Sequence, residues 1–204
     1  MVQEVKPTRS ELQNLKKRIK LAYSGYNLLK KKRDGLILEF FEILKQAKSL
    51  RKELTDQYKQ ALNTINITRV VEGDQNLQSL AMAVVTKPEI ELQSKNIMGV
   101  VVPKIKSQAI VHHFMDRGYG TIKSSTLIDN AAFSYEKVVE KVIQAAETET
   151  TIKKLLEEIE KTKRRVNALE FEVIPKMKEQ EKFIKMRLEE MDRETVFRMK
   201  RIKG

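Results

Sequence analysis

The chain has 204 residues and a net charge of +12; a third of its residues are charged, and it contains seven glycines, four prolines and no cysteine. This composition is typical of long helices, and the lack of cysteine excludes disulfides and thiolate metal sites. The adjacent His112 and His113 make a poor metal pair, no apolar run approaches the roughly 18 residues of a membrane span, and the N-terminus has no signal-peptide apolar region, so we expect a soluble cytoplasmic protein.

A long helix is predicted in the first segment, residues 1–65. Thr8 and Glu11 fit a capping box at its start. Apolar residues then follow in alternating steps of three and four over about eight heptads, which predicts a coiled-coil partner helix and not a globular core. This seam consists of Leu12, Leu15, Ile19, Ala22, Tyr26, Leu29, Arg33, Leu36, Phe40, Ile43, Ala47, Leu50, Leu54, Gln57, Ala61 and Thr64. Arg33 is expected either to pair with an acid of the partner helix or to reach out to solvent.

The middle segment, residues 66–125, has a different pattern. Gly73 and Asp74 signal a turn, and residues 77–85 could form a short helix. Two short β runs, residues 89–93 and 97–102, flank the polar residues 94–96, which predicts a β-hairpin with its turn there. The hairpin positions of interest are Ile90, Leu92, Ile97, Met98, Gly99, Val100 and Pro103. Residues 117–120 are predicted to form a loose connector.

A second long helix is predicted in residues 126–204. Thr126 and Asp129 fit another capping box. The expected apolar positions are Ile128, Ala131, Tyr135, Val138, Val142, Ala145, Ile152, Leu156, Ile159, Val166, Leu169, Val173, Met177, Ile184, Leu188, Met191, Met199 and Ile202. Pro175 should kink this helix or open one hydrogen bond. The fold class is therefore mainly α: a long antiparallel two-helix coiled coil with a small middle region that contains a β-hairpin and a short helix.

The positive charge gathers at both ends of the chain. Residues 1–33 carry ten Lys and Arg against Glu4 and Glu11, a net charge of +8, and Arg198, Lys200, Arg201 and Lys203 make the C-terminus basic. If the two helices run antiparallel, these ends meet at one tip. A basic tip needs an acidic or polyanionic partner.

Catalytic chemistry is hard to build from these residues. The sequence has no glycine-rich phosphate loop and no distinctive Ser/His/Asp spacing, so we expect neither an independent enzyme nor a cofactor. The carboxylates of the second helix alternate with Lys and Arg, as in a solvated face with ion pairs. Met186, Met191 and Met199 could be core residues, or an adaptable contact surface where no partner helix covers them.

Several segments together resemble the D subunit of the V-type and A-type rotary ATPases. They are the opening VKPTR (5–9), the run LLKKKRD (28–34), the segment NIMGVVVP (96–103), RRVNALE (164–170) with VIP (173–175), RLEE (187–190) and FRMKRIK (197–203). They occur in the expected order over essentially the whole chain. The combination with the NIMGV segment is specific, whereas single coiled-coil pieces resemble one another.

The resemblance implies a non-catalytic rotor shaft that transmits torque between an ATP-handling hexamer and a membrane ion-translocating ring. The implied partners are the catalytic and non-catalytic subunits A and B, the small F subunit and the funnel-shaped C (or d) subunit. Nucleic acid is not expected, membrane contact would be indirect, and the complex would lie at the cytoplasmic face of the cell membrane. The hypothetical hexamer-facing tip consists of Arg9, Lys16, Arg18, Arg198, Met199, Lys200 and Arg201.

Two alternatives use the same features. A basic coiled coil could bind nucleic acid through residues 16–20 and 30–33, although no recognition helix, stacking aromatics or known motif accompanies them. A structural adaptor or secretion-apparatus stalk would share the helical rod without responding to a catalytic hexamer.

Overall fold

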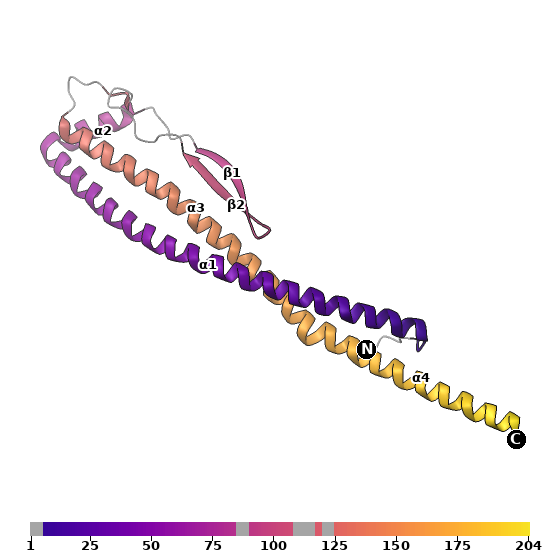
Figure 1. Ribbon diagram of the computed structural model, residues 1–204. Coiled ribbons are helices and arrows are strands. Elements are labelled where there is room, and N and C mark those ends of the chain that lie inside the picture. The colour runs from indigo at the N-terminus through magenta and orange to yellow at the C-terminus, as the bar shows by residue number, and fades with distance from the viewer. Residues whose placement is uncertain (1–5, 85–89, 108–116, 120–124) are drawn as a thin grey trace. The chain divides into compact units, whose positions relative to one another are not determined.

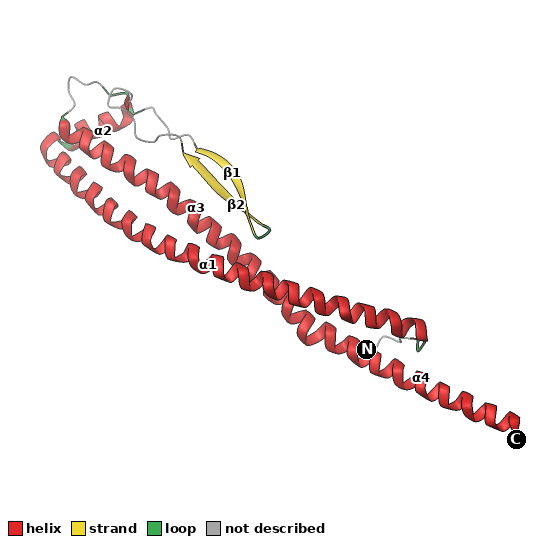
Figure 2. Cartoon of the chain, viewed as in Figure 1, coloured by secondary structure: helices red, strands yellow, loops and turns green. Residues whose placement is uncertain are grey.

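A computed structural model describes residues 6–84, 90–107, 117–119 and 125–204. In chain order the elements are α1 (Arg9–Glu72), α2 (Asp74–Ala83), β1 (Ile90–Ile97), β2 (Val100–Ser107), α3 (Thr126–Ala168), a π-helical turn (Leu169–Val173) and α4 (Ile174–Lys203) (Figures 1 and 2). The two strands pair antiparallel. The predicted mainly α fold with one small hairpin is confirmed.

Helix α1 begins at the predicted cap and ends later than predicted. The Thr8 Oγ1 accepts a hydrogen bond from the Glu11 N–H at 3.2 Å, while the Thr8 N–H donates to the Lys6 carbonyl, so half of the capping box forms. The helix continues seven residues past 65 because the seam does: Thr68, four residues after Thr64, is fully buried. Gly73, with φ 80° and ψ 150°, then ends the helix in a positive-φ conformation that glycine adopts far more readily than other residues.

The chain divides into two compact units, which we describe separately. Unit 1 comprises residues 1–37 and 158–204, and unit 2 comprises residues 38–157. In unit 1, α1 runs antiparallel to α4 and the end of α3, as the ion pairs Arg9–Asp192 (3.0 Å) and Lys32–Glu158 (3.4 Å) show. Its core is formed by Leu15, Ile19 and Ile184, with Leu12, Met177 and Leu188 packed against them.

In unit 2 the second part of α1 runs antiparallel to α3. Lys141 donates to Glu53 at 3.1 Å, and the Thr68 Oγ1 donates to the Leu127 carbonyl at 3.3 Å. Across both units, none of the sixteen predicted seam positions of α1 is exposed. Burial of a continuous apolar stripe is what stabilises helices of this length.

The predicted seam of α3 was wrong at two positions. Val142 and Leu156 are exposed, and the adjacent Ile143 and Leu155 are buried instead. Ile143 and Leu155 lie one turn before Glu147 and one turn after Thr151, and these last two line a hollow beneath the hairpin. Ile143, Glu147, Thr151 and Leu155 thus follow one another in steps of four residues along α3, which differs from the predicted seam.

The hairpin turn lies at Met98 and Gly99, and not at residues 94–96 as predicted. Both turn residues have positive φ, 49° and 86°, as a two-residue turn of this handedness requires. The Asn96 Oδ1 accepts a hydrogen bond from the Gly99 N–H at 2.8 Å. Because the loop is only two residues long, residues 94–96 are free to extend strand β1.

The N-cap of α3 lies one residue before the predicted Thr126, and the second long helix is interrupted at the place that Pro175 predicts. The Ser125 Oγ accepts from the Leu127 N–H at 3.3 Å, so Ser125, and not Thr126, is the N-cap. The π turn ends at Val173, directly before Ile174 and Pro175. Proline lacks the N–H that an α-helical bond to Phe171 would need, and the wider turn accommodates this loss.

Candidate interaction surfaces

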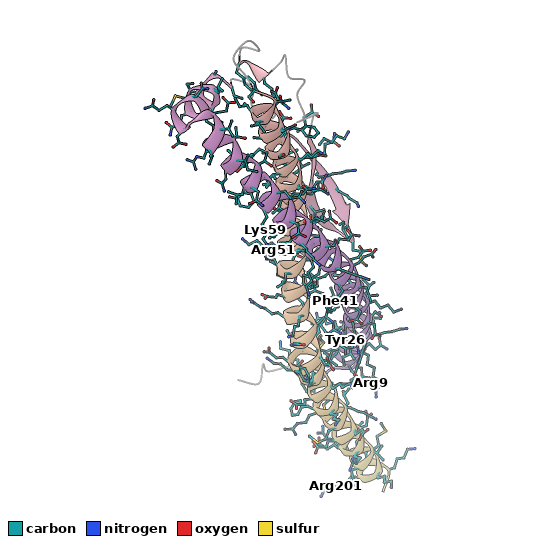
Figure 3. The ribbon with its side chains drawn as sticks, turned by 90° about the vertical axis from the view of Figure 1, so that its left-hand side faces the viewer. Arg9, Tyr26, Phe41, Arg51, Lys59 and Arg201 are labelled. Atoms are coloured by element: carbon teal, nitrogen blue, oxygen red, sulfur yellow. The ribbon has the colours of Figure 1, made fainter. Side chains whose placement is uncertain are left out.

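The residues of the hypothetical tip lie at one end of unit 1. Arg9 at the start of α1 lies beside α4, and Arg201 lies further along α4 (Figure 3). Lys16, Arg18, Arg198, Met199, Lys200 and Arg201 are all exposed. The pairs Arg9–Asp192 and Arg198–Glu194 join side chains that are themselves exposed. Such pairs are worth roughly 0–1 kcal/mol, so a partner can displace them at little cost.

Unit 1 carries nearly all of the net charge. Its 24 Lys and Arg outnumber its 13 Asp and Glu, which leaves +11 of the total of +12. Between Glu11 and Asp34, helix α1 has eight basic residues and no acidic one. α4 instead mixes both signs and forms the pairs Arg187–Glu190 and Arg198–Glu194 within the helix. The positive potential is therefore strongest along α1 of unit 1.

The seam arginine does not pair with the partner helix. The Arg33 guanidinium donates twice to the Asp34 carboxylate, at 2.8 and 3.0 Å, on its own helix. The cross-helix ion pair forms one residue earlier, between Lys32 and Glu158. The hypothesis that Arg33 pairs with an acid of the partner helix was therefore wrong.

The last turns of α4 present exposed apolar side chains, and no helix among the described residues covers them (Figure 1). Met191, Met199 and Ile202 were predicted seam positions, yet all three are exposed, as are Val196 and Phe197. In unit 1, α4 continues past the start of α1 (Figure 1). Met191 and Met199 are thus not core residues.

Strand β2 of the hairpin is hydrogen-bonded to side chains of α3. The Glu147 carboxylate accepts from the Ile105 N–H at 3.0 Å, and the Lys154 Nζ donates to the Val101 carbonyl at 3.2 Å. Val100 and Val102 are buried, whereas Ile90, Leu92 and Met98 are exposed. A hollow of about 140 Å³ is lined by the hairpin and both helices of unit 2; its lining includes Ile97 and Pro103 on the hairpin and Ile43 on α1. The predicted hairpin residues thus divide into a covered and an open set.

Residues 117–119 form an anchored segment and not the predicted loose connector. The Arg117 guanidinium, 7 % exposed, donates to both carboxylate oxygens of Glu136 at 2.9 and 3.0 Å. The Tyr119 hydroxyl donates to the Asp129 carboxylate at 2.7 Å. Both partners lie on α3, which places a buried ion pair on the helix. The sequence here shows only an Arg and a Tyr next to glycines, and this combination is too common to predict that the Arg is buried.

Burial and hydrogen bonding shift two ionisation equilibria in this segment. Burial raises the pKa of the Tyr119 phenol above its ordinary value, and the hydrogen bond to Asp129 raises it further. Burial works to lower the pKa of Arg117, but the hydrogen bonds to Glu136 and Tyr119 and the charges of both groups together outweigh it, so the pKa of Arg117 lies above its usual value. Tyr119 therefore stays a donor, and Arg117 stays charged, throughout the physiological range.

Other predicted features are quickly placed. His112 and His113 lie outside the described residues. Over the described ranges, no three His, Asp or Glu side chains come together as metal ligands. Nor does any helix in those ranges combine the length and apolar character that crossing a bilayer requires.

Comparison with known proteins gives a match over almost the whole chain. A model of the family described as the ATP synthase D subunit matches residues 11–204. The chain is 59% identical to the A-type ATP synthase D subunit of Methanococcoides burtonii, with 98% of this chain and 97% of that protein covered. It is 55% identical to the protein of the same name from Methanoregula boonei, with 100% and 97% covered. Identity to that of Methanosarcina acetivorans is 56%, with 99% and 97% covered.

Proposed function

Because this chain belongs to the ATP synthase D-subunit family, we propose that it is the non-catalytic central rotor shaft of an A-type ATP synthase. Membership makes it part of a membrane-associated ATP synthase complex. The shaft role is supported most by one observation: a continuous helix of 64 residues whose seam positions are covered throughout. A helix pair of this kind transmits torque because turning one end must either turn the other or break the packed seam.

The exposed surface of unit 1 suits rotation inside a bore. A shaft must meet several equivalent surfaces in turn without binding any of them tightly. The exposed Lys, Arg and Glu side chains hold weakly, because each exposed pair is worth roughly 0–1 kcal/mol. We expect the partner surface, contributed by the catalytic and non-catalytic subunits A and B, to be acidic, since unit 1 carries a net charge of +11.

The remaining partners are assigned to unit 2. We propose that the small F subunit and the funnel-shaped C (or d) subunit bind on the hairpin side, and that the chain couples through them to the ion-translocating ring. The chain would then lie at the cytoplasmic face of the membrane and contact the bilayer only indirectly. Nucleotide would be bound by the hexamer and not by this chain.

Deletion of residues 192–204 tests the role of the tip. These residues lie beyond the unit 1 core, whose last member is Leu188, so the shortened chain should lose only the helix content of the deleted turns and keep its unfolding temperature. We expect it to assemble less tightly with the hexamer or to couple poorly, measured as ATP-driven rotation and torque in the reconstituted complex. Unchanged rotation and torque would count against the proposal. A matched control replaces exposed Lys153 of unit 2 by Gln, which should leave rotation unchanged.

A second function remains testable because one observation favours it. The acid-free basic stretch of α1 between Glu11 and Asp34 could neutralise phosphates. Nucleic-acid binding predicts an affinity for DNA or RNA that falls steeply with salt concentration. Binding to the hexamer with no such affinity would decide for the shaft.

A further inference from the structure

The hairpin has one open edge, and we propose that this edge of β1 binds an extended segment of a partner polypeptide as a third strand. The partner is taken to turn with the chain, and in this respect the inference rests on the proposed function. The surface involved is the outer edge of Ile90–Ile97, on the side of the hairpin away from β2.

The direction of the backbone groups follows from the register. In an antiparallel pair, opposite residues alternate between bonding each other and pointing their N–H and C=O groups away from the ladder. The two-residue turn closes on the bonded pair Ile97–Val100, so the next pair, Asn96–Val101, points outward. Because the outward residues alternate with bonded ones, every second residue of β1 points outward, and the others are Ser94, Leu92 and Ile90.

Strand β2 independently supports this parity. The Val101 carbonyl accepts from Lys154, and the Ile105 N–H donates to Glu147, so both residues direct backbone groups toward α3. Pro103, midway between them, has no N–H to lose on this edge. The residues opposite them on β1, at 96, 94 and 92, must therefore face the other way.

The two edges of the hairpin differ in their cover. Side chains of α3 occupy the edge of β2, whereas seven of the eight residues of β1 are exposed and no described residue bonds to its outer edge. An uncovered row of N–H and C=O groups matches one kind of ligand closely, an extended peptide that completes the ladder.

Two of the four side chains of β1 on the face away from the helices, those of Ile90 and Leu92, are apolar, while those of Ser94 and Asn96 are polar. On the face away from the helices, Ile90, Leu92 and Val101 are 46, 73 and 57 % exposed. A hairpin covered on one face normally shows polar residues on the other. Apolar side chains of an added strand would lie next to Ile90 and Leu92 and remove them from water.

Charge specifies the other face of the added strand. Glu91 and Lys95 project toward the helix side, four residues apart. An antiparallel strand would fit best with a basic residue opposite Glu91 and an acidic residue opposite Lys95, since opposite charges across a ladder stabilise it. The partner is thus an extended segment with apolar residues on one face and this charge pair on the other. Backbone hydrogen bonds to the four outward residues of β1 would make the complex long-lived, as expected for a partner that turns with the chain.

Amide hydrogen exchange on the whole chain, free and in the reconstituted complex, tests the third strand directly. The amides of residues 91, 93, 95 and 97 already bond within the hairpin, so assembly should change them little. The outward amides of residues 90, 92, 94 and 96 should slow by about tenfold or more on assembly. Unchanged exchange at these four amides in an actively rotating complex would overturn the inference and leave the proposed function intact. A complex that does not rotate but protects these four amides would support the third strand and contradict the proposed shaft function.

Substitution of Ser94 separates the edge from the rest of the hairpin. Ser94→Pro removes one outward N–H and leaves the ladder with β2 bonded, as Pro103 does on the opposite strand. It should weaken binding of the partner by about tenfold, and Ser94→Ala, which keeps the N–H, should not. Protection in the complex measured at residues 95 and 97 verifies that the hairpin of the variant is still folded. Equal affinity of the two variants would contradict a third strand.

Exchange of the two charges distinguishes the partner from a second copy of this chain. If two β1 edges pair antiparallel, Glu91 can face Lys95 of the second copy, so Glu91→Lys combined with Lys95→Glu restores both pairs. A different partner would meet two like charges, and its binding should weaken by about fivefold. Self-association of the free chain in sedimentation equilibrium that survives the double exchange would overturn the proposal.

Discussion

Replacing Arg117 by Met should destabilise unit 2 far more than its position in a short connecting segment suggests. The guanidinium is 7 % exposed and bonds both oxygens of Glu136, whose side chain is 15 % exposed. Removing the cation leaves a largely buried carboxylate without its partner, which typically costs 3–5 kcal/mol. Since Glu136 keeps some contact with water, we expect about 3 kcal/mol.

A second substitution tests the physical reason for this loss. Arg117→Met combined with Glu136→Met removes both charges and keeps apolar volume, so the double variant should lie within about 1 kcal/mol of the original chain. The control is Arg164→Met, which breaks an exposed pair with Glu160 and should cost at most about 0.5 kcal/mol.

The free energy of unfolding is measured by urea denaturation followed by circular dichroism. A cost below about 1 kcal/mol for the single variant would show that the pair does not hold residues 117–119 on α3. A double variant as unstable as the single one would show that packing of the Arg117 stem, and not its charge, stabilises the segment.

Three further changes test the core, the turn and the phenol. Ile184→Ala should cost about 2–4 kcal/mol in urea denaturation because the side chain is fully buried between Leu15 and Ile19, whereas exposed Phe183→Ala should cost under about 1 kcal/mol. Met98→Asn should stabilise the hairpin by about 0.5–1 kcal/mol, because Asn tolerates a φ of 49° better; slower exchange of the hairpin amides would show it, and faster exchange would refute it. The raised pKa of Tyr119 means that its protonated form stabilises the fold; this stabilisation is complete below the unfolded value of about 10 and is lost as pH rises through the folded pKa. The stability difference from Tyr119→Phe should therefore be constant from about pH 7 to 9 and shrink at higher pH, and a difference that grows there would contradict the assignment.

The sequence predicted the long elements because their signals are local and repeated. The seam of α1 recurs every three or four residues, so single polar members such as Gln57 did not obscure it. Thr8 marked the start of α1, and Pro175 marked the interruption in the second helix, since capping and the missing N–H act within one turn. The clustering of charge near both termini was equally visible.

The sequence did not predict features that depend on a third element or on one backbone angle. Ile143 is buried in place of Val142, and the hairpin bonds to α3 at Glu147 and Lys154; the periodicity of two paired helices contains no information about such a third element. The turn at Met98 required a methionine with positive φ, which propensity disfavours. Arg117 gave no sign of burial, because its partner Glu136 lies nineteen residues away.

By itself, the amino-acid sequence determined that two long helices pair through an apolar seam, that a hairpin interrupts them and that the charge is concentrated near the ends. Only the tertiary structure decided three features: that α3 covers the β2 edge of the hairpin, that Arg117 pairs with Glu136, and that α4 extends beyond the start of α1. The physical reason is range: a heptad repeat is written in neighbouring residues, whereas an edge, a buried ion pair and an uncovered helix end exist only when distant segments are brought together.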